Sequence, residues 1–141
     1  METQLAPAPV RSRPPEAEKI TINLGYVDLG HIDLLVAESF YSNRTDFIRT
    51  AIRNQLAAHG DTLKQVVARK MLVLGLQQFG SADLEAVRRA GEKLEIRVVG
   101  LAVIAADVTP ELARETIGSL TVLGALHASA EVKAVLADRL R

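Results

Sequence analysis

The sequence contains no cysteine, so disulfide bonds, thiol catalysis and cysteine-held zinc or iron–sulfur sites are excluded, and a reducing cytoplasm fits. Its 17 basic and 17 acidic side chains balance, so any cationic surface for nucleic acid has to be local. No apolar run reaches the ~18 residues of a membrane-spanning helix. The first residues, METQLAPAPVRSRPPE, lack a signal-peptide pattern. The 141 residues, of which 48% are hydrophobic, therefore predict one or two small folded domains and no membrane partner.

Motifs for catalysis are also missing. Gly75, Gly100 and Gly124 form no dinucleotide-binding or phosphate-binding loop pattern. His127 has no carboxylate or nucleophile at a spacing typical of a catalytic site, and the other two histidines stand alone in the sequence. We therefore expect no enzyme activity, no cofactor and no metal site. Residues 1–17, rich in proline and poor in large apolar groups, are expected to form a disordered arm.

The stretch EKITINLG, residues 18–25, alternates strictly between apolar and polar side chains. This period predicts a half-buried β-strand. Its apolar face would carry Ile20, Ile22 and Leu24, and its polar face Lys19, Thr21 and Asn23. The next predicted strand lies beyond two helical segments, so this strand has no evident partner in its own chain for its backbone N–H and C=O groups.

Two helices are predicted after the strand. The first covers residues 28–40, with Asp28 as a candidate cap and Phe40 on its apolar side. The second is the clearest amphipathic helix of the chain and runs from about Asn43 to His59, with Ser42 as N-cap and a stop at Gly60. Its apolar side carries Phe47, Ile48 and Ile52. Residues 61–70 are expected to be a linker or a helical extension.

A strand and two helices in residues 18–60 are close to the minimum size of an independent domain, and such small units usually need oligomerisation, metal or disulfides. With metal and disulfides excluded, oligomerisation remains. The strand can pair antiparallel with the same strand of a second chain about a two-fold axis. The predicted core of this homodimer consists of Ile20, Ile22, Leu24, Phe47, Ile48 and Ile52.

This segment resembles the ribbon-helix-helix family, the MetJ/Arc/CopG type of bacterial DNA-binding proteins. The resemblance rests on KITINL, a following helix, and YSNRTDFIRTAIRNQL, and it covers about a third of the chain. It implies that the two-stranded ribbon enters the major groove of double-stranded DNA, where Lys19, Thr21 and Asn23 contact bases. It also implies a phosphate site at the start of the second helix, on Ser42, Asn43 and Arg44. The glycine-containing entry to the first helix, GYVDLG, departs from the pattern.

The chemistry of these residues supports the same interpretation. A two-stranded ribbon fits the major groove, where lysine can donate to guanine and asparagine can pair with adenine. Helix N-terminal amides favour a phosphate. Residues 42–70 also hold six basic side chains against two acidic ones, a local excess of +4 that the net charge of zero conceals. The basic residues are Arg44, Arg49, Arg53, Lys64, Arg69 and Lys70.

The rest of the chain contains three similar segments that begin near Val73, Val98 and Val122. Each starts with an apolar, strand-like run and ends in a short helical pattern. Each contains a glycine, and these are spaced by 25 and 24 residues (75, 100, 124). The spacing predicts a solenoid-like repeat of one strand and one helix per unit. The alternative is an ordinary small α/β domain whose glycines are unrelated. Asp83, Thr109 and Ser129 lie near the predicted helix starts.

Together these patterns predict an α+β protein with a ribbon-helix-helix domain at residues 18–60 and an α/β repeat domain at residues 71–141. The repeat domain is expected to serve oligomerisation above the dimer, or binding of an effector or protein partner. The favoured function is a bacterial, cytoplasmic transcriptional regulator that represses its target. One alternative is an antitoxin, whose C-terminal part would hold a toxin. Such a toxin-binding part is usually a disordered tail. Another is a scaffold protein that assembles through its repeats, although the charged end LADRLR suits a cap.

Overall fold

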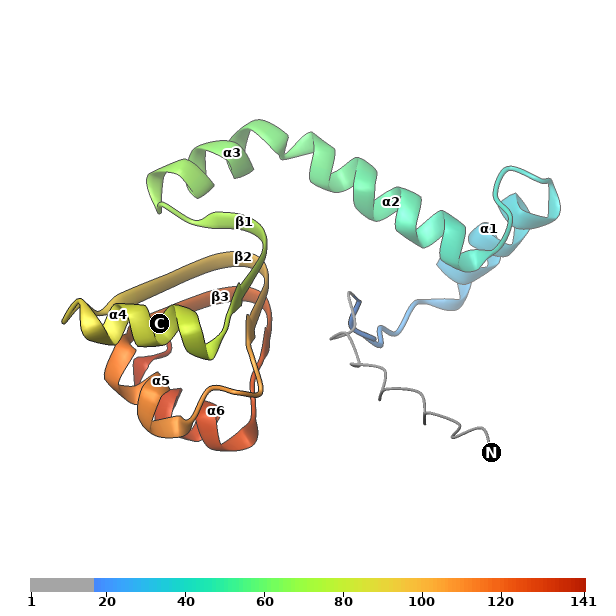
Figure 1. Ribbon diagram of the computed structural model, residues 1–141. Coiled ribbons are helices and arrows are strands. Elements are labelled where there is room, and N and C mark those ends of the chain that lie inside the picture. The colour runs from blue at the N-terminus through green and yellow to red at the C-terminus, as the bar shows by residue number, and fades with distance from the viewer. Residues whose placement is uncertain (1–16) are drawn as a thin grey trace, which may run out of the picture. The chain divides into compact units, whose positions relative to one another are not determined.

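The computed structural model describes residues 17–141, in two compact units, Lys19–Met71 and Leu72–Arg141 (Figure 1). The predicted arm, residues 1–17, lies outside the described residues except for Ala17. The first unit is helical, and the second contains a parallel three-stranded sheet with helices between the strands. The protein is therefore an α+β protein, as predicted.

The first unit contains three helices, α1 (Tyr26–Ala37), α2 (Arg44–Ala58) and α3 (Gly60–Arg69). Two corrections to the sequence-based expectation concern α1. It begins at Tyr26, with Gly25 as N-cap, so that Asp28 lies in the first turn rather than at the cap. It also ends at Ala37, and Phe40 lies in the following turn, largely exposed.

The end of α2 also differs from the prediction. His59 serves both as C-cap of α2 and as N-cap of α3, with φ −99° and ψ 11°. Gly60 is consequently the first residue of α3 and not a stop signal. Residues 61–69 are helical, which decides between the linker and the extension that the sequence left open.

Residues 18–25 form no β-strand in the described chain, contrary to the expectation of one strand here. The alternating pattern is present, but a strand is defined by hydrogen bonds to a neighbouring strand, and no segment of the described residues pairs with this one. The specific layout of one ribbon strand and two helices is therefore not what the single chain displays.

The second unit repeats a strand and a helix three times: β1 (Val73–Phe79), α4 (Ser81–Arg89), β2 (Leu94–Ile104), α5 (Pro110–Thr116), β3 (Ile117–His127) and α6 (Ala130–Leu136). A short 3₁₀ turn, η1 (Ala137–Arg139), follows. The strands are parallel in the order β1-β2-β3, and Figure 1 shows the three helices on one side of the sheet. Strands β2 and β3 begin before Val98 and Val122, at Leu94 and Ile117.

The three glycines of the repeat lie side by side in the sheet: Gly75 pairs with Gly100, and Gly100 with Gly124. All three have positive φ, at 116°, 135° and 119°. A Cβ on Gly100 would lie 2.2 Å from the carbonyl oxygen of Gly75, and one on Gly124 would lie 2.1 Å from that of Gly100. Only glycine tolerates this backbone and this approach. The glycines are therefore one structural feature repeated in register, not unrelated residues.

The core of the second unit lies between the sheet and its helices. Side chains of one sheet face, such as Ile96 and Leu120, pack with Leu84, Leu112 and Val132 of the three helices. Helix starts follow the predicted polar residues: Thr109 Oγ1 accepts from the Leu112 amide and Ser129 Oγ from the Val132 amide, each at 3.2 Å. Asp83 instead lies inside α4, where its carboxylate accepts from the Gly80 amide at 2.8 Å.

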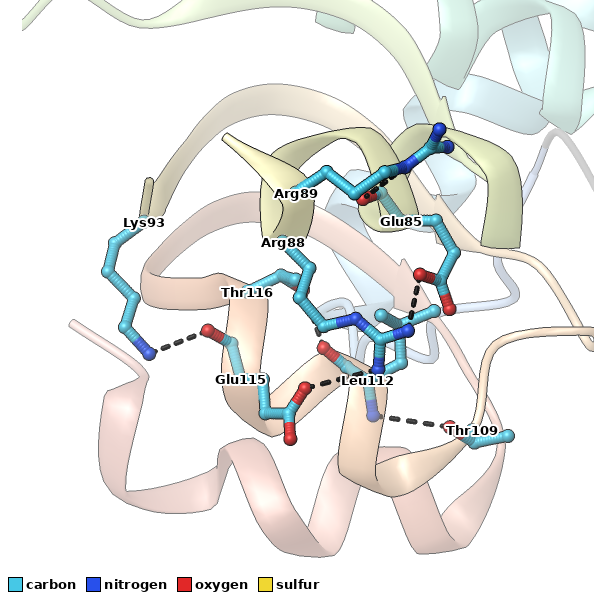
Figure 2. A network of polar contacts seen from close by, with 8 residues as sticks. All are labelled: Glu85, Arg88, Arg89, Lys93, Thr109, Leu112, Glu115 and Thr116. Carbon is cyan, nitrogen blue, oxygen red and sulfur yellow. Dashed lines mark hydrogen bonds and ion pairs between the residues drawn. The ribbon is translucent and has the colours of Figure 1, made fainter. Parts of the chain in front are cut away.

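Polar contacts tie α4 and α5 together at the surface, as Figure 2 shows. The Arg88 guanidinium donates to Glu85 on its own helix and to Glu115 on α5, at 3.3 Å for the second contact. These carboxylates raise the pKa of Arg88. Lys93 donates to the Glu115 carbonyl oxygen at 2.6 Å. The buried Thr116 hydroxyl donates to the Leu112 carbonyl oxygen, so its burial leaves no unpaired group.

Candidate nucleic-acid interface

The segment before α1 is exposed along its whole length. Every residue from Glu18 to Gly25 is exposed, including the apolar Ile20 and Ile22, whose exposed fractions are 74% and 59%. The predicted base-contacting side chains, Lys19, Thr21 and Asn23, are exposed as well. Both faces of the segment, one apolar and one polar, are thus open for contacts.

Only one residue of the first unit is buried, Ile32 of α1, at 6% exposure. The remaining predicted dimer-core residues are half-buried or exposed: Phe47 and Ile48 are half-buried, and Leu24 and Ile52 are exposed. Phe47 packs edge-on against Tyr41, with ring centroids 5.0 Å apart. A unit with a single buried side chain has too little core to be stable alone, because burial of apolar area is the main favourable term in folding.

The start of α2 is built by a reciprocal pair of hydrogen bonds. The Asn43 side chain accepts from the Asp46 amide at 2.8 Å, and the Ser42 amide donates to the Asp46 carboxylate at 3.0 Å. The N-cap is therefore Asn43, and the prediction of Ser42 was wrong by one residue. Both residue types cap well, but only Asn43 brings its side chain to the amide of Asp46 while Asp46 reaches back.

Arg44 is held by an acidic residue of α1. Its Nε and Nη2 donate to the two carboxylate oxygens of Asp33, at 2.7 and 2.8 Å. Both side chains are about half exposed. The hydrogen bonds from Arg44 lower the pKa of Asp33 below its ordinary value, and Asp33 in turn raises the pKa of Arg44. This bidentate pair joins α1 to the start of α2 and neutralises the cation predicted to meet a phosphate.

Two backbone donors stay open beside this pair. Within residues 17–141, the amides of Arg44 and Thr45 form no hydrogen bond. They lie in the first turn of a 15-residue helix, where the helix dipole favours an anion. Further along α2, Arg49 and Arg53 are exposed and form no ion pair with any described residue. The start of α2 therefore offers two open backbone donors, and two exposed cations lie further along the same helix.

Other classes of site find no support in the described part of the chain. No group of three or more histidine, aspartate or glutamate side chains there is placed to hold a metal ion. No described helix is both long enough and apolar enough to cross a membrane. The exposed alternating segment, together with the start of α2, is thus the best candidate site in the chain.

Comparison with known families decides what this site belongs to. Residues 15–133 match the model of the Ribbon-Helix-Helix transcriptional regulator family. The chain belongs to this family. The match covers the exposed segment, all three helices of the first unit and the whole sheet, so the family model includes most of the second unit too. Searches of curated proteins and of solved structures found no significant match.

Membership confirms the resemblance to ribbon-helix-helix proteins and supports DNA binding, dimerisation and a role in transcription regulation. Sequence reasoning missed one residue of the site, Asp33. No spacing in the sequence points to it, because its partner Arg44 lies on another helix and the contact depends on how α1 and α2 pack.

Proposed function

We propose that this ribbon-helix-helix protein is a sequence-specific repressor that binds its operator as a homodimer. Residues 18–25 of two chains pair antiparallel and form a two-stranded ribbon. Its apolar face, with Ile20, Ile22 and Leu24, covers α1 and α2 of both chains. Its polar face enters the major groove of double-stranded DNA, where Lys19, Thr21 and Asn23 contact base edges. Such a regulator would act in a bacterial cytoplasm.

One observation carries the proposal: the alternating segment is fully exposed and unpaired in a unit that buries a single side chain. Pairing about a two-fold axis would satisfy the backbone groups of the segment and bury its apolar face in the same step. Phe47, Ile48 and Ile52 on α2 would complete the shared core, since they are half-buried or exposed in the single chain.

The phosphate site is proposed at the start of α2, on Ser42, Asn43 and Arg44. The structure refines how these residues would act. The open amides of Arg44 and Thr45 supply hydrogen-bond donors, and the helix dipole favours the anion. Arg44 contributes its charge when a phosphate displaces Asp33, because a bidentate guanidinium can pair with either acid.

The second unit supports a regulator over the two alternatives. An antitoxin tail would be disordered until it meets its toxin, whereas this unit has its own buried core. A scaffold that stacks end to end needs open sheet edges. Here Leu140 bridges to Leu120 on the outer edge of β3, and the Arg141 amide donates to the Leu120 carbonyl oxygen at 2.9 Å.

The test replaces Thr21 and Asn23 by alanine. The operator would first be obtained by selecting tight-binding sequences from random DNA. Specific binding should then fall by about 1–3 kcal/mol for each lost base contact. The dimer, measured by sedimentation, should stay intact, because both side chains are exposed in the chain and face away from the proposed core.

A matched control is Asn54→Ala with Thr62→Ala, which removes the same two side-chain types from exposed positions on α2 and α3. It should bind the operator like the unchanged protein. Equal operator affinity of both double variants, as intact dimers, would show that Thr21 and Asn23 do not contact bases.

A further inference from the structure

The sheet of the second unit has one face that its own helices do not cover. Side chains alternate across a strand, and α4, α5 and α6 pack on the face of Ile96, Val98 and Leu120. We call the opposite face the open face. It contains two apolar rows, one on each side of the glycine row formed by Gly75, Gly100 and Gly124. The rows are Leu74–Val99–Leu123 and Leu76–Leu101–Ala125.

The open face is strongly apolar, and its leucines on β1 and β3 are exposed, whereas Val99, Leu101 and Ala125 are half-buried. Leu74, Leu76 and Leu123 have exposed fractions of 73%, 58% and 55%. Polar side chains stand only at its two ends, with the Glu95–Arg97 ion pair at one and His127 near the other. An all-parallel sheet normally has both faces covered, and a contiguous apolar patch with a polar rim marks an interaction surface.

We propose that the open face docks against the open face of the second copy within the same dimer. This inference rests on the proposed ribbon dimer. Family membership provides a second copy of the same face, and only Lys70, Met71 and Leu72 separate α3 from β1. The face has no charge at its centre that would select a charged partner, and an uncharged apolar surface can match itself about a two-fold axis.

The size of the face decides that docking occurs inside the dimer. Three strands about 4.8 Å apart, with roughly seven residues of about 3.3 Å each, give a face of about 330 Å² per copy. A stable interface between free proteins buries about 800 Å² per partner. The open face alone is too small for that. Two faces already tethered by the ribbon meet at an effective concentration of about 1 mM, which makes a small contact sufficient.

The test uses the absence of cysteine in the chain. Leu101 lies on β2, the central strand, so Leu101→Cys places a single thiol near the middle of the open face. The matched control is Glu131→Cys, an exposed position on α6 in the helical layer. Both full-length variants are treated with a short bis-maleimide at low protein concentration, and sedimentation of the same samples gives their mass before the reaction.

Docking predicts that Leu101→Cys forms covalent dimers at least about ten times faster than Glu131→Cys, whose thiols meet only through the tether. Adding Leu123→Arg to Leu101→Cys should return the rate to that of the control, because a guanidinium on the open face opposes docking. The mass before the reaction should stay that of a dimer in all three variants.

Each other result contradicts the docking. If both variants are dimers and Leu101→Cys forms covalent dimers no faster than Glu131→Cys, the docking of the open faces is wrong, but the ribbon dimer is not contradicted. A Leu101 thiol that still resists a single maleimide when Leu123→Arg is also present, so that docking is opposed, would mean that a segment of the same chain covers the face. Covalent dimers whose rate of formation rises with protein concentration would place the contact between dimers, because a reaction within one dimer does not depend on concentration. A monomeric chain would overturn the ribbon dimer itself.

Discussion

Replacing Asp33 by asparagine should release Arg44 at the start of α2. In the free protein, two hydrogen bonds of 2.7 and 2.8 Å hold the guanidinium on the Asp33 carboxylate. Asparagine has nearly the same shape but no charge, so it keeps the fold and weakens the hold. The freed cation lies next to the open amides of Arg44 and Thr45, where a DNA phosphate would bind.

The size of the effect follows from counterion release. In the unchanged protein, a phosphate that displaces Asp33 leaves this carboxylate to attract a cation of its own, which offsets the counterion released from the DNA. Without Asp33 each contact between Arg44 and a phosphate counts in full, so the slope of log K against log salt should steepen by at most about 0.9 per chain, or about 1.8 per dimer. Between about 50 mM and 200 mM salt, a steeper slope of 1.8 corresponds to an additional affinity loss of about 12-fold. The Asp33→Asn variant should therefore bind DNA of any sequence more tightly at low salt and lose this advantage as salt rises.

The assay is a fluorescence titration of operator and random DNA at several salt concentrations. Asp61→Asn is the matched control, since it removes the same acidic group from an exposed position on α3 that has no ion pair with a described residue. Its slope should change little. If Asp33→Asn and Asp61→Asn gave equal slopes and equal affinities, Arg44 would not contact phosphate and the proposed phosphate site would lose its charged member.

Three further outcomes are expected. Gly75→Ala should cost about 1–3 kcal/mol in urea unfolding, the usual cost of a strained backbone. Gly100→Ala should cost clearly more, because its Cβ would also meet a backbone oxygen at 2.2 Å; equal costs would contradict the close approach. The Asp33 carboxyl has a folded pKa below its ordinary 3.8, so the stability that it provides is complete above that pH and is lost as pH falls through the folded pKa. Unfolding curves should show wild type and Asp33→Asn converging only below about pH 4; convergence near neutral pH would rule this out. A fragment of residues 1–71 should still sediment as a dimer and bind operator, and a monomeric fragment would mean that the second unit is needed for the dimer core.

Periodicity in the sequence predicted the elements whose packing is local. The apolar spacing of Phe47, Ile48 and Ile52 located α2, and the glycine spacing predicted three units in register. Errors arose where neighbouring residues could do the same task. Ser42 and Asn43 both cap helices well, and the choice between them depends on the side chain of Asp46.

Contacts between different helices and strands could not be predicted from the sequence. The Asp33–Arg44 pair joins two helices through packing that no spacing encodes. The true starts of β2 and β3, at Leu94 and Ile117, were missed because the apolar run after them is the stronger signal. The segment 18–25 shows the opposite case: its pattern is clear, but forming a strand depends on a partner that one sequence does not contain.

The glycine row also sets a rule for lengthening the sheet. Each glycine after the first lies against the carbonyl oxygen of the glycine one strand earlier, and the position next to Gly75 is empty within 4 Å. A fourth unit engineered between α3 and β1 would therefore fit only if its own glycine occupied the same register, about 25 residues upstream of Gly75. The Leu140 bridge obstructs the opposite edge at Leu120. The sheet can therefore be lengthened at the β1 edge but not at the β3 edge, which matters to anyone who designs regulators with longer sheets.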